Sequence, residues 1–380
     1  MLRNFIFAFI ILTFADDIVA QTNNFKFILN GTFNTDTGLA LLMPVSKESY
    51  YPHNHATYNS QIVNGKFRFT DSIAYPYEFR LVVKIKDTLR YISDFFIVDT
   101  GIQNIVCNID SQREVPSIIN RGMIELKTDF ADVFKPVELE FDKDYKSYDS
   151  LLNIYDNKIP DSLQLLLSNE KSKLHDERNS ILLHYVQQHP DSYVALWNLI
   201  KQFNNNGYER VFDSIYNQFS DSIKATFTGQ ALLKELSQSG VVAVGKQFPK
   251  LMLLDQQNQA ISIPSFKSNS KYIFIDFWFS SCEPCISQFE QLKNIVDTYN
   301  VRGFEIIGIS TDNKSDINNW KSVITKYKLS WKQYLDANGK EAKKLSILLF
   351  PSNFLLDSNG KIIMKNIEPT QLSSFLQKNL

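Results

Sequence analysis

The sequence predicts a multidomain protein with an all-β region first, a helical region in the middle and an α/β region last. Three observations predict this order. At 380 residues the chain is too long for one ordinary core. Short alternating apolar runs dominate residues 22–128, whereas apolar residues recur at helical spacing over residues 129–239. Over residues 241–380 strands alternate with helices, which favours a mixed sheet covered by helices on both faces.

Composition and charge describe an ordinary globular protein. Hydrophobic residues make up 44% of the chain, aromatic residues 13%, and the formal net charge is −1. This balance supplies ample core material and no electrostatic attraction toward nucleic acid or anionic membranes. We therefore expect no nucleic-acid partner.

Residues 1–20 have the pattern of an export signal. Residues 1–4 form a short basic start, and residues 5–14 form an apolar run too short to span a bilayer. A site for signal-peptide cleavage then follows at Ile18-Val19-Ala20, before Gln21. We expect a cleaved signal peptide, and hence a location in the periplasm or cell envelope. A retained N-terminal anchor is the alternative, and no later stretch approaches the length of a membrane span.

Residues 22–128 predict an antiparallel β domain, either a sandwich or a barrel. Ile62-Val63 and Phe67-Arg68-Phe69 flank Asn64-Gly65, the strongest short signal for a hairpin. Further short runs follow at regular spacing, at residues 77–83, 91–98 and 104–109.

Two chemical features of this β region have ordinary explanations. Cys107 lies on its last clear strand, and we interpret it as a small buried hydrophobe rather than a third redox cysteine. His53 and His55 form an HxH pair, which a polar loop between strands explains at least as well as a metal site does. We therefore predict no metal site.

Residues 129–239 predict a helical connector domain. Leu163, Leu166 and Leu167 share one helical face. His189-Pro190 breaks a helix, after which Asp191 is expected to cap the next one. The region contains no cluster of chemically active groups, so its apolar stripes indicate core packing.

Residues 241–380 contain a pair of cysteines in a strand–helix pattern, and the functional prediction depends on this pair. A hairpin at residues 251–263 is followed by a buried strand at residues 272–275. That strand leads to Cys282-Glu283-Pro284-Cys285, which opens a helix. A strand at residues 304–309, two helical segments, two further strands and a final helix complete the region. The two cysteines therefore lie where a strand feeds a helix.

This placement predicts dithiol chemistry. On a first helical turn, the sulfurs of Cys282 and Cys285 come close enough to bridge. The free N–H groups and positive end of the helix dipole favour a thiolate at Cys282. Zinc binding lacks ligands, because there is no second cysteine pair and no histidine beyond His189. A hydrolase would lack a histidine base here as well.

The motifs resemble those of a known family. Residues 275–278, the CEPC motif at residues 282–285 and Phe350-Pro351-Ser352 resemble the thioredoxin superfamily. The CEPC residues, the preceding hairpin and the extra helix and strand between residues 312 and 336 are similar to the TlpA/ResA-like branch. The resemblance covers residues 241–380 and implies a thioredoxin-like fold.

The resemblance also implies an activity. It indicates a thiol-disulfide oxidoreductase that acts on protein thiols and disulfides, in the reducing direction, with an upstream thiol reductant and no cofactor. Such a protein would serve redox homeostasis in the cell envelope. More weakly, residues 24–115 resemble a small β domain of unknown function that precedes such domains in envelope proteins of Gram-negative bacteria, and that part implies no function.

Residue roles follow from the resemblance position by position. Cys282 matches the attacking cysteine and Cys285 the resolving one, and the helix geometry predicts that Cys282 is the more exposed of the two. Asp276 matches a buried acid whose raised pKa suits it to move the proton of Cys285. Pro351 matches a cis-proline, so that the backbone of Phe350 is expected to dock an extended substrate segment.

Five further positions support or modify the site. Trp278 is expected to pack under the motif, Glu283 to face solvent and slightly disfavour the Cys282 thiolate, and Pro284 to fit the first helical turn. The sequence has Ser281 where a tryptophan is frequent, and Gln288 where some relatives carry a glutamate. The first difference puts substrate preference in doubt, and the second leaves Asp276 as the proton carrier.

Two alternatives remain open from the sequence. A peroxiredoxin-like thiol peroxidase shares the fold, although residues 279–281 lack the proline expected before its peroxide-attacking cysteine. A non-enzymatic envelope binding or scaffold protein would carry the thioredoxin-like domain as an appendage.

Overall fold

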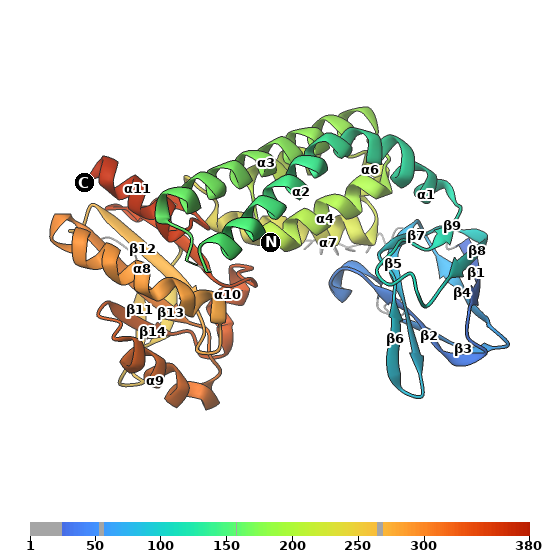
Figure 1. Cartoon of the computed structure of the whole chain (residues 1–380). Coiled ribbons are helices and arrows are strands. Elements are labelled where there is room, and N and C mark those ends of the chain that lie inside the picture. The colour runs from blue at the N-terminus through green and yellow to red at the C-terminus, as the bar shows by residue number, and fades with distance from the viewer. Residues whose placement is uncertain (1–24, 53–56, 157, 264–268) are drawn as a thin grey trace, which may run out of the picture.

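A computed structural model of the chain describes residues 25–52, 57–156, 158–263 and 269–380. Figure 1 shows the three regions in chain order: β strands, then long helices, then a sheet with helices. The expected multidomain architecture is confirmed. The expected signal peptide at residues 1–20 and the pair His53 and His55 lie outside the described residues.

The N-terminal β region forms one connected nine-stranded sheet with the order β6-β5-β2-β3-β4-β1-β8-β9, and β7 pairs with β5. Asn64 and Gly65 both have positive φ and join β3 to β4, which confirms the predicted hairpin. Neighbouring strands are antiparallel except β1 and β8, which are parallel. The expectation of a purely antiparallel domain is wrong at this pair. A long connection separates β1 from β8 in the chain, and such a connection allows two strands to pair in parallel. The strands are β1 (Phe25–Phe33), β2 (Thr37–Pro44), β3 (Tyr58–Val63), β4 (Lys66–Ile73), β5 (Tyr77–Ile85), β6 (Thr88–Ile92), β7 (Phe96–Val98), β8 (Gly101–Cys107) and β9 (Ser117–Ile118).

The middle region is helical, and its first helix begins at Arg121. Ser192 caps α4, because its Oγ accepts the N–H of Ala195 at 2.9 Å. The expected cap at Asp191 is wrong. Its carboxylate accepts hydrogen bonds from Ser220 and Ser222 instead. The helices are α1 (Arg121–Glu125), a π-helical turn (Leu126–Phe130), α2 (Ala131–Ile154), α3 (Asp161–Gln188), α4 (Tyr193–Asn206), α5 (Arg210–Gln218), α6 (Asp221–Lys224) and α7 (Phe227–Ser239).

The β region and the helices share one hydrophobic core. Trp197 of α4 stacks on Tyr51, with ring centroids 5.1 Å apart, and its Nε1 donates to the carbonyl of Pro76. Thr228 of α7 donates to the carbonyl of Tyr50 at 2.8 Å. The helical region is therefore packed onto the sheet as part of the same body.

The C-terminal region is a seven-stranded mixed sheet with the order β11-β10-β14-β13-β12-β15-β16. Its central strand β12 pairs with β13 in parallel and with β15 antiparallel. Side chains of α8, α9 and α11 pack on one face, and those around α10 pack on the other. The elements are β10 (Leu251–Leu254), β11 (Ala260–Ile263), β12 (Tyr272–Trp278), α8 (Glu283–Tyr299), β13 (Phe304–Ser310), α9 (Ile317–Tyr327), β14 (Lys332–Leu335), α10 (Lys340–Lys344), β15 (Ser352–Asp357), β16 (Ile362–Lys365) and α11 (Pro369–Asn379).

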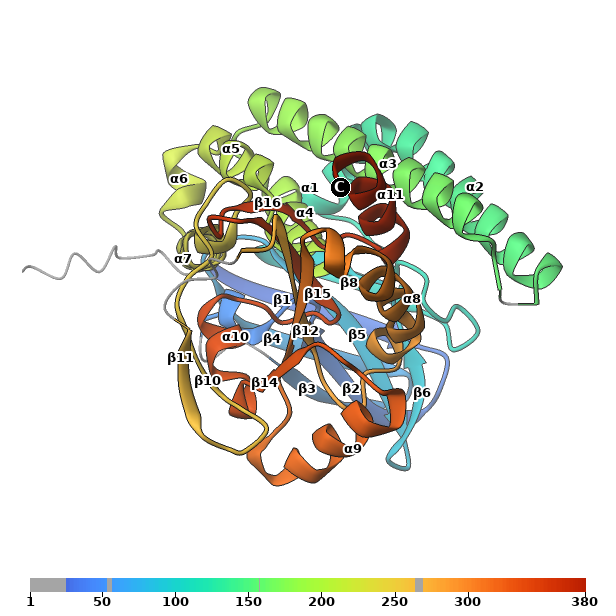
Figure 2. The same ribbon diagram turned by 90° about the vertical axis from the view of Figure 1, so that its left-hand side faces the viewer.

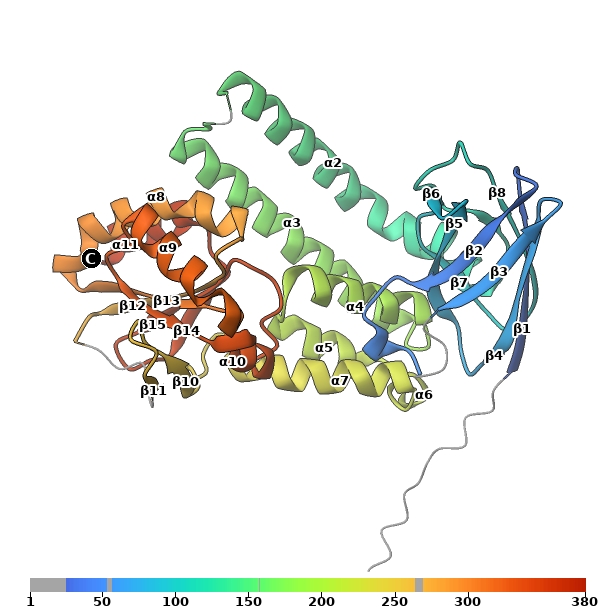
Figure 3. The ribbon, with the colours of Figure 1, turned by 90° about the horizontal axis from the view of Figure 1, so that it is seen from below.

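The edge strand β16 of the C-terminal sheet forms backbone hydrogen bonds with the segment that follows the helical region. The segment after α7 pairs with β16, where Gly245 donates to the carbonyl of Ile362 at 2.7 Å and Ile362 donates to Lys246 at 2.8 Å. Lys365 at the end of β16 donates to the carbonyl of Tyr208 at 2.9 Å. Figures 2 and 3 show the resulting arrangement, with α3 running past α11 toward α8.

Candidate active site

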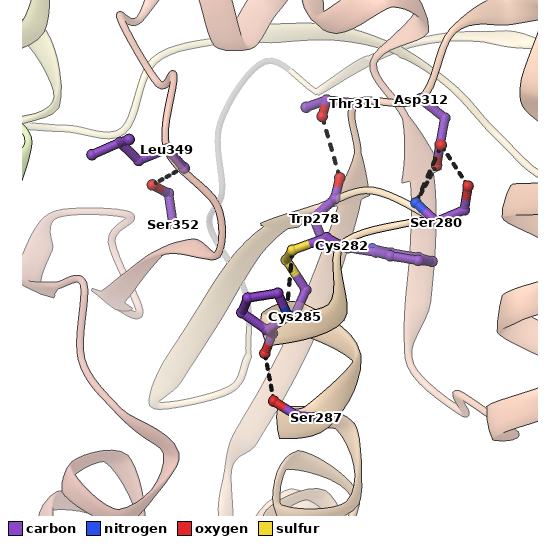
Figure 4. Close-up of a disulfide and its surroundings, with 10 residues drawn as sticks. Trp278, Ser280, Cys282, Cys285, Ser287, Thr311, Asp312, Leu349 and Ser352 are labelled. Atoms are coloured by element: carbon purple, nitrogen blue, oxygen red, sulfur yellow. Dashed lines mark hydrogen bonds between the residues drawn. A yellow bond between two sulfur atoms is a disulfide. The ribbon is translucent and has the colours of Figure 1, made fainter. Parts of the chain in front are cut away.

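The CEPC motif lies at the junction of the central strand and α8 (Figure 4). A disulfide joins Cys282 and Cys285, whose Cα atoms are 5.3 Å apart. Cys282 is the N-cap of α8, and its Sγ accepts the N–H of Cys285 at 3.2 Å. Pro284 lies in the first turn, where its missing N–H leaves no gap in the helix. This geometry favours negative charge on Cys282.

Both cysteines are buried in this oxidised state. Cys282 is 4% exposed and Cys285 2%, so Cys282 is the more exposed of the two, as expected, but only by a small margin. The disulfide turns the two sulfurs toward each other, and both belong to the apolar cluster that includes Trp278 and Phe289. Glu283 and Pro284, by contrast, are exposed as expected.

Asp312 fixes the loop that leads into the motif. Its carboxylate accepts the N–H of Ser280 at 2.9 Å, the hydroxyl of Ser280 at 2.7 Å and the hydroxyl of Ser310 at 2.6 Å. The neighbouring Thr311 donates its N–H to the carbonyl of Trp278 at 2.8 Å. These bonds hold the end of β12 against the end of β13 just ahead of Cys282 (Figure 4).

Asp312 is a residue that the sequence interpretation missed. The available signal was the polar run Ser310-Thr311-Asp312 at the carboxyl end of a strand parallel to the one that feeds the motif. The carboxyl ends of parallel strands meet at one edge of a sheet, so such side chains lie near each other.

Asp276 is a buried carboxyl group on the same face of β12 as the motif. Asp276 and Trp278 are two positions apart on the strand, so their side chains point to the same face. Trp278 packs in the cluster that holds both cysteines. Asp276 is 3% exposed, and no described residue donates a hydrogen bond to its carboxyl group. Burial raises the pKa of Asp276 to about 7. The carboxyl therefore changes its protonation near neutral pH.

The side chain of Trp278 packs in the same apolar cluster as the two cysteines of the motif. It is fully buried and meets the ring of Phe289 edge to face, with centroids 5.2 Å apart. Its Nε1 donates to Oε1 of Gln333 at 3.2 Å. Gly308 of β13 leaves room for Gln333, since a Cβ at position 308 would collide with the same oxygen.

The peptide bond between Phe350 and Pro351 is cis, as expected. The ring of Phe350 meets that of Phe279 edge to face, with centroids 5.4 Å apart. Phe279 directly precedes the loop that carries the motif, so this contact brings the Phe350-Pro351 loop beside the redox site.

The structure separates the remaining candidates from this site. Cys107 lies at the end of β8, is buried, and is a free thiol. Burial raises the pKa of Cys107 to about 12. Within the described ranges, no group of three or more His, Cys, Asp or Glu side chains is arranged to hold a metal ion. Gln288 lies on the surface of α8 and donates to Glu368 at 3.3 Å.

Comparison with known proteins identifies relatives of the C-terminal region. Residues 244–365 match the AhpC/TSA family. The thiol-disulfide oxidoreductase ResA of Bacillus cereus is 29% identical over 145 residues, which are 37% of this chain and 82% of that protein. ResA of Bacillus thuringiensis subsp. konkukian is 30% identical over 138 residues, which are 36% of this chain and 78% of that protein.

A solved structure gives a similar alignment. A thiol-disulfide oxidoreductase from Bacteroides fragilis is 31% identical, covers 36% of this chain and 100% of its own, and has a TM-score of 0.32. The family match at residues 244–365 lies in the C-terminal third, and the two Bacillus relatives match about a third of this chain, so the β and helical regions are outside this likeness. Through that third, the chain belongs to the ResA-type thiol-disulfide oxidoreductases, which are enzymes of the thioredoxin-like fold.

Proposed function

We propose that this protein is an exported reductase that exchanges its Cys282-Cys285 dithiol with disulfides of protein substrates. The single observation that carries the proposal is the pair of bonded cysteines at the start of α8, at the end of the central strand. Two cysteines so close can pass two electrons to a disulfide and close a bond between themselves.

The first step uses Cys282. In the reduced enzyme its thiolate is stabilised by the N-terminus of α8 and by the N–H of Cys285. The thiolate attacks one sulfur of the client disulfide. A mixed disulfide forms, and the other client sulfur leaves as a thiolate.

The second step uses Cys285 and Asp276. Cys285 loses its proton, and its thiolate attacks the sulfur of Cys282 in the mixed disulfide. The second client sulfur is released, and the enzyme keeps the Cys282-Cys285 disulfide. Asp276 takes up the proton of Cys285, because its pKa of about 7 lets it accept and release a proton near neutral pH.

Phe350 and Pro351 form the edge on which the client docks. The N–H of Phe350 has no hydrogen-bond partner among the described residues, and its side chain is only half-buried. An extended client segment can pair with this backbone while its disulfide faces Cys282.

Location and direction complete the proposal. Residues 1–20 have the pattern of an export signal, which would place the enzyme in the periplasm or cell envelope. None of the helices in the described parts of the chain has the length and apolar character needed to cross a bilayer. Each turnover oxidises the enzyme by two electrons, so a thiol reductant upstream must restore the dithiol.

Reduction of insulin by dithiothreitol tests the activity. Wild type is expected to accelerate the reaction, Cys282→Ser to abolish the acceleration, and Cys107→Ser to retain it as the matched control. The proposal fails if Cys282→Ser is as active as wild type. Consumption of hydrogen peroxide by wild type, with no acceleration of insulin reduction, would favour a thiol peroxidase instead.

A further inference from the structure

We propose that the end of α4 and the turn after it, residues 204–208, form the second wall of the client-binding cleft. The client would be an extended polypeptide segment that carries the disulfide and lies between the thioredoxin-like and helical regions. This inference rests on the proposed function and adds the class of substrate that the site selects.

A cleft of about 580 Å³ borders the redox motif. Pro284, which lies between the two cysteines, is at its rim, together with Gln288 and Pro351. The opposite side is formed by Asn204, Asn205 and neighbouring residues of the helical region. Pockets of about 300–1,000 Å³ enclose ligands of drug size, so the cleft has room for a few residues of extended chain. A folded domain is too large to enter it.

The thioredoxin-like wall has the chemistry that an extended peptide requires. Leu348 and Leu349 are 48% and 44% exposed, so two adjacent apolar side chains of the cleft lining are open to solvent. The N–H groups of Leu348, Leu349 and Phe350 have no hydrogen-bond partner among the residues that the structure describes. These donors can pair with the carbonyl groups of a bound chain, while the leucines contact its apolar side chains. Figure 4 shows Leu349 on the loop that leads to β15.

The helical wall is polar. Asn204, Asn205 and Asn206 end α4 and line the cleft. Asn205 is exposed and Asn206 is partly exposed, so their side-chain amides can donate hydrogen bonds to the backbone of a bound segment and accept them from it.

The two walls are held at a fixed separation. Lys365 of β16 donates to the carbonyl of Tyr208, and both residues line the cleft. Farther along, the amide of Gln291 on α8 donates to Asp161 at 3.2 Å and to Gln164 at 3.3 Å, both on α3. These contacts lie in separate parts of the interface between the helical and thioredoxin-like regions, so they fix the distance between the two walls of the cleft. The two Bacillus ResA proteins match about a third of this chain, so the helical wall lies outside that likeness.

Cleft-filling variants test the inference in the full-length protein. Asn205 is exposed, so Asn205→Trp adds bulk to the cleft without disturbing a core. Asn217→Trp, on the exposed surface of α5 and away from the cleft, is the matched control. Leu349→Ser removes apolar contact from the other wall. The reduced proteins are mixed either with an unstructured peptide closed by one internal disulfide or with bis(2-hydroxyethyl) disulfide, and oxidation is followed by tryptophan fluorescence.

The readout is the ratio of the rate constant for the peptide to that for the small disulfide. We expect Asn205→Trp to lower this ratio about tenfold, Leu349→Ser to lower it severalfold, and Asn217→Trp to leave it unchanged. An unchanged ratio in Asn205→Trp and Leu349→Ser overturns the inference, and so does an equal fall in all three variants. If wild type reacts with neither disulfide, the proposed function itself fails, which is a separate result.

Discussion

Replacement of Asp276 by asparagine provides a quantitative test of its environment. Asp276 is buried, and its pKa of about 7 compares with an ordinary value of 3.8. At about 1.36 kcal/mol per pKa unit, the difference corresponds to about 4 kcal/mol. Most domains unfold with about 5–15 kcal/mol, so an effect of this size is measurable.

The sign of the effect follows from proton binding. Between pH 4 and 7 the folded chain keeps the Asp276 proton, whereas the unfolded chain loses it. The stabilisation that this proton gives is complete below about pH 4 and is lost as the pH rises through about 7. Asparagine cannot ionise, so Asp276→Asn should unfold with nearly the wild-type free energy near pH 4. By pH 8 the variant should be more stable by up to about 4 kcal/mol.

Urea unfolding of the oxidised protein at several pH values is the assay. Tryptophan fluorescence reports mainly on the C-terminal region, because three of the four tryptophans lie there. Asp297→Asn, the same substitution at an exposed position of α8, is the matched control. If Asp276→Asn and wild type differ by the same amount at pH 4.5 and pH 8, the reasoning about burial is refuted.

Three other predictions concern the loop, the shared core and the free thiol. Asp312→Ala leaves the N–H and hydroxyl donors of Ser280 unpaired, so it should lower the free energy of unfolding in urea by about 1–3 kcal/mol and slow insulin reduction. Asp312→Asn should retain part of the stability and part of the activity. Lys201→Met removes the partner 3.3 Å from the buried Glu78 and should cost about 3–5 kcal/mol in thermal or urea unfolding, and a loss below about 1 kcal/mol would contradict this. Cys107 should resist iodoacetamide at pH 8 until the protein is unfolded, as mass spectrometry of the labelled peptide would report.

Local patterns explain how much of the site could be predicted from the sequence. The run of apolar residues before Asp276 and the helical spacing after Cys285 are both contiguous, so they identified the strand, the helix and the motif between them. The hairpin at Asn64 and Gly65 was equally local. Pro351 needed the family resemblance, because nothing in its own neighbourhood specifies a cis bond.

Long-range contacts explain what could not be predicted. The contact of Asp312 with Ser280 spans 32 residues and depends on the parallel pairing of β12 with β13. The shared core of the β and helical regions depends on Trp197 reaching residues more than a hundred positions earlier. The same holds for the cleft wall at Asn204, which approaches the motif only through tertiary packing. Periodicity identifies which face of an element is apolar, but it does not identify the partner of that face.

The order of the two cysteines is the central claim, and a trapped intermediate tests it most directly. Cys285→Ser lacks the resolving thiol, so its reaction with a single-disulfide peptide should stop at the mixed disulfide. Mass spectrometry after digestion should find the peptide attached to Cys282, and Cys282→Ser should form little adduct. An adduct at Cys107, or faster trapping through Cys285 in the Cys282→Ser protein, would contradict the account.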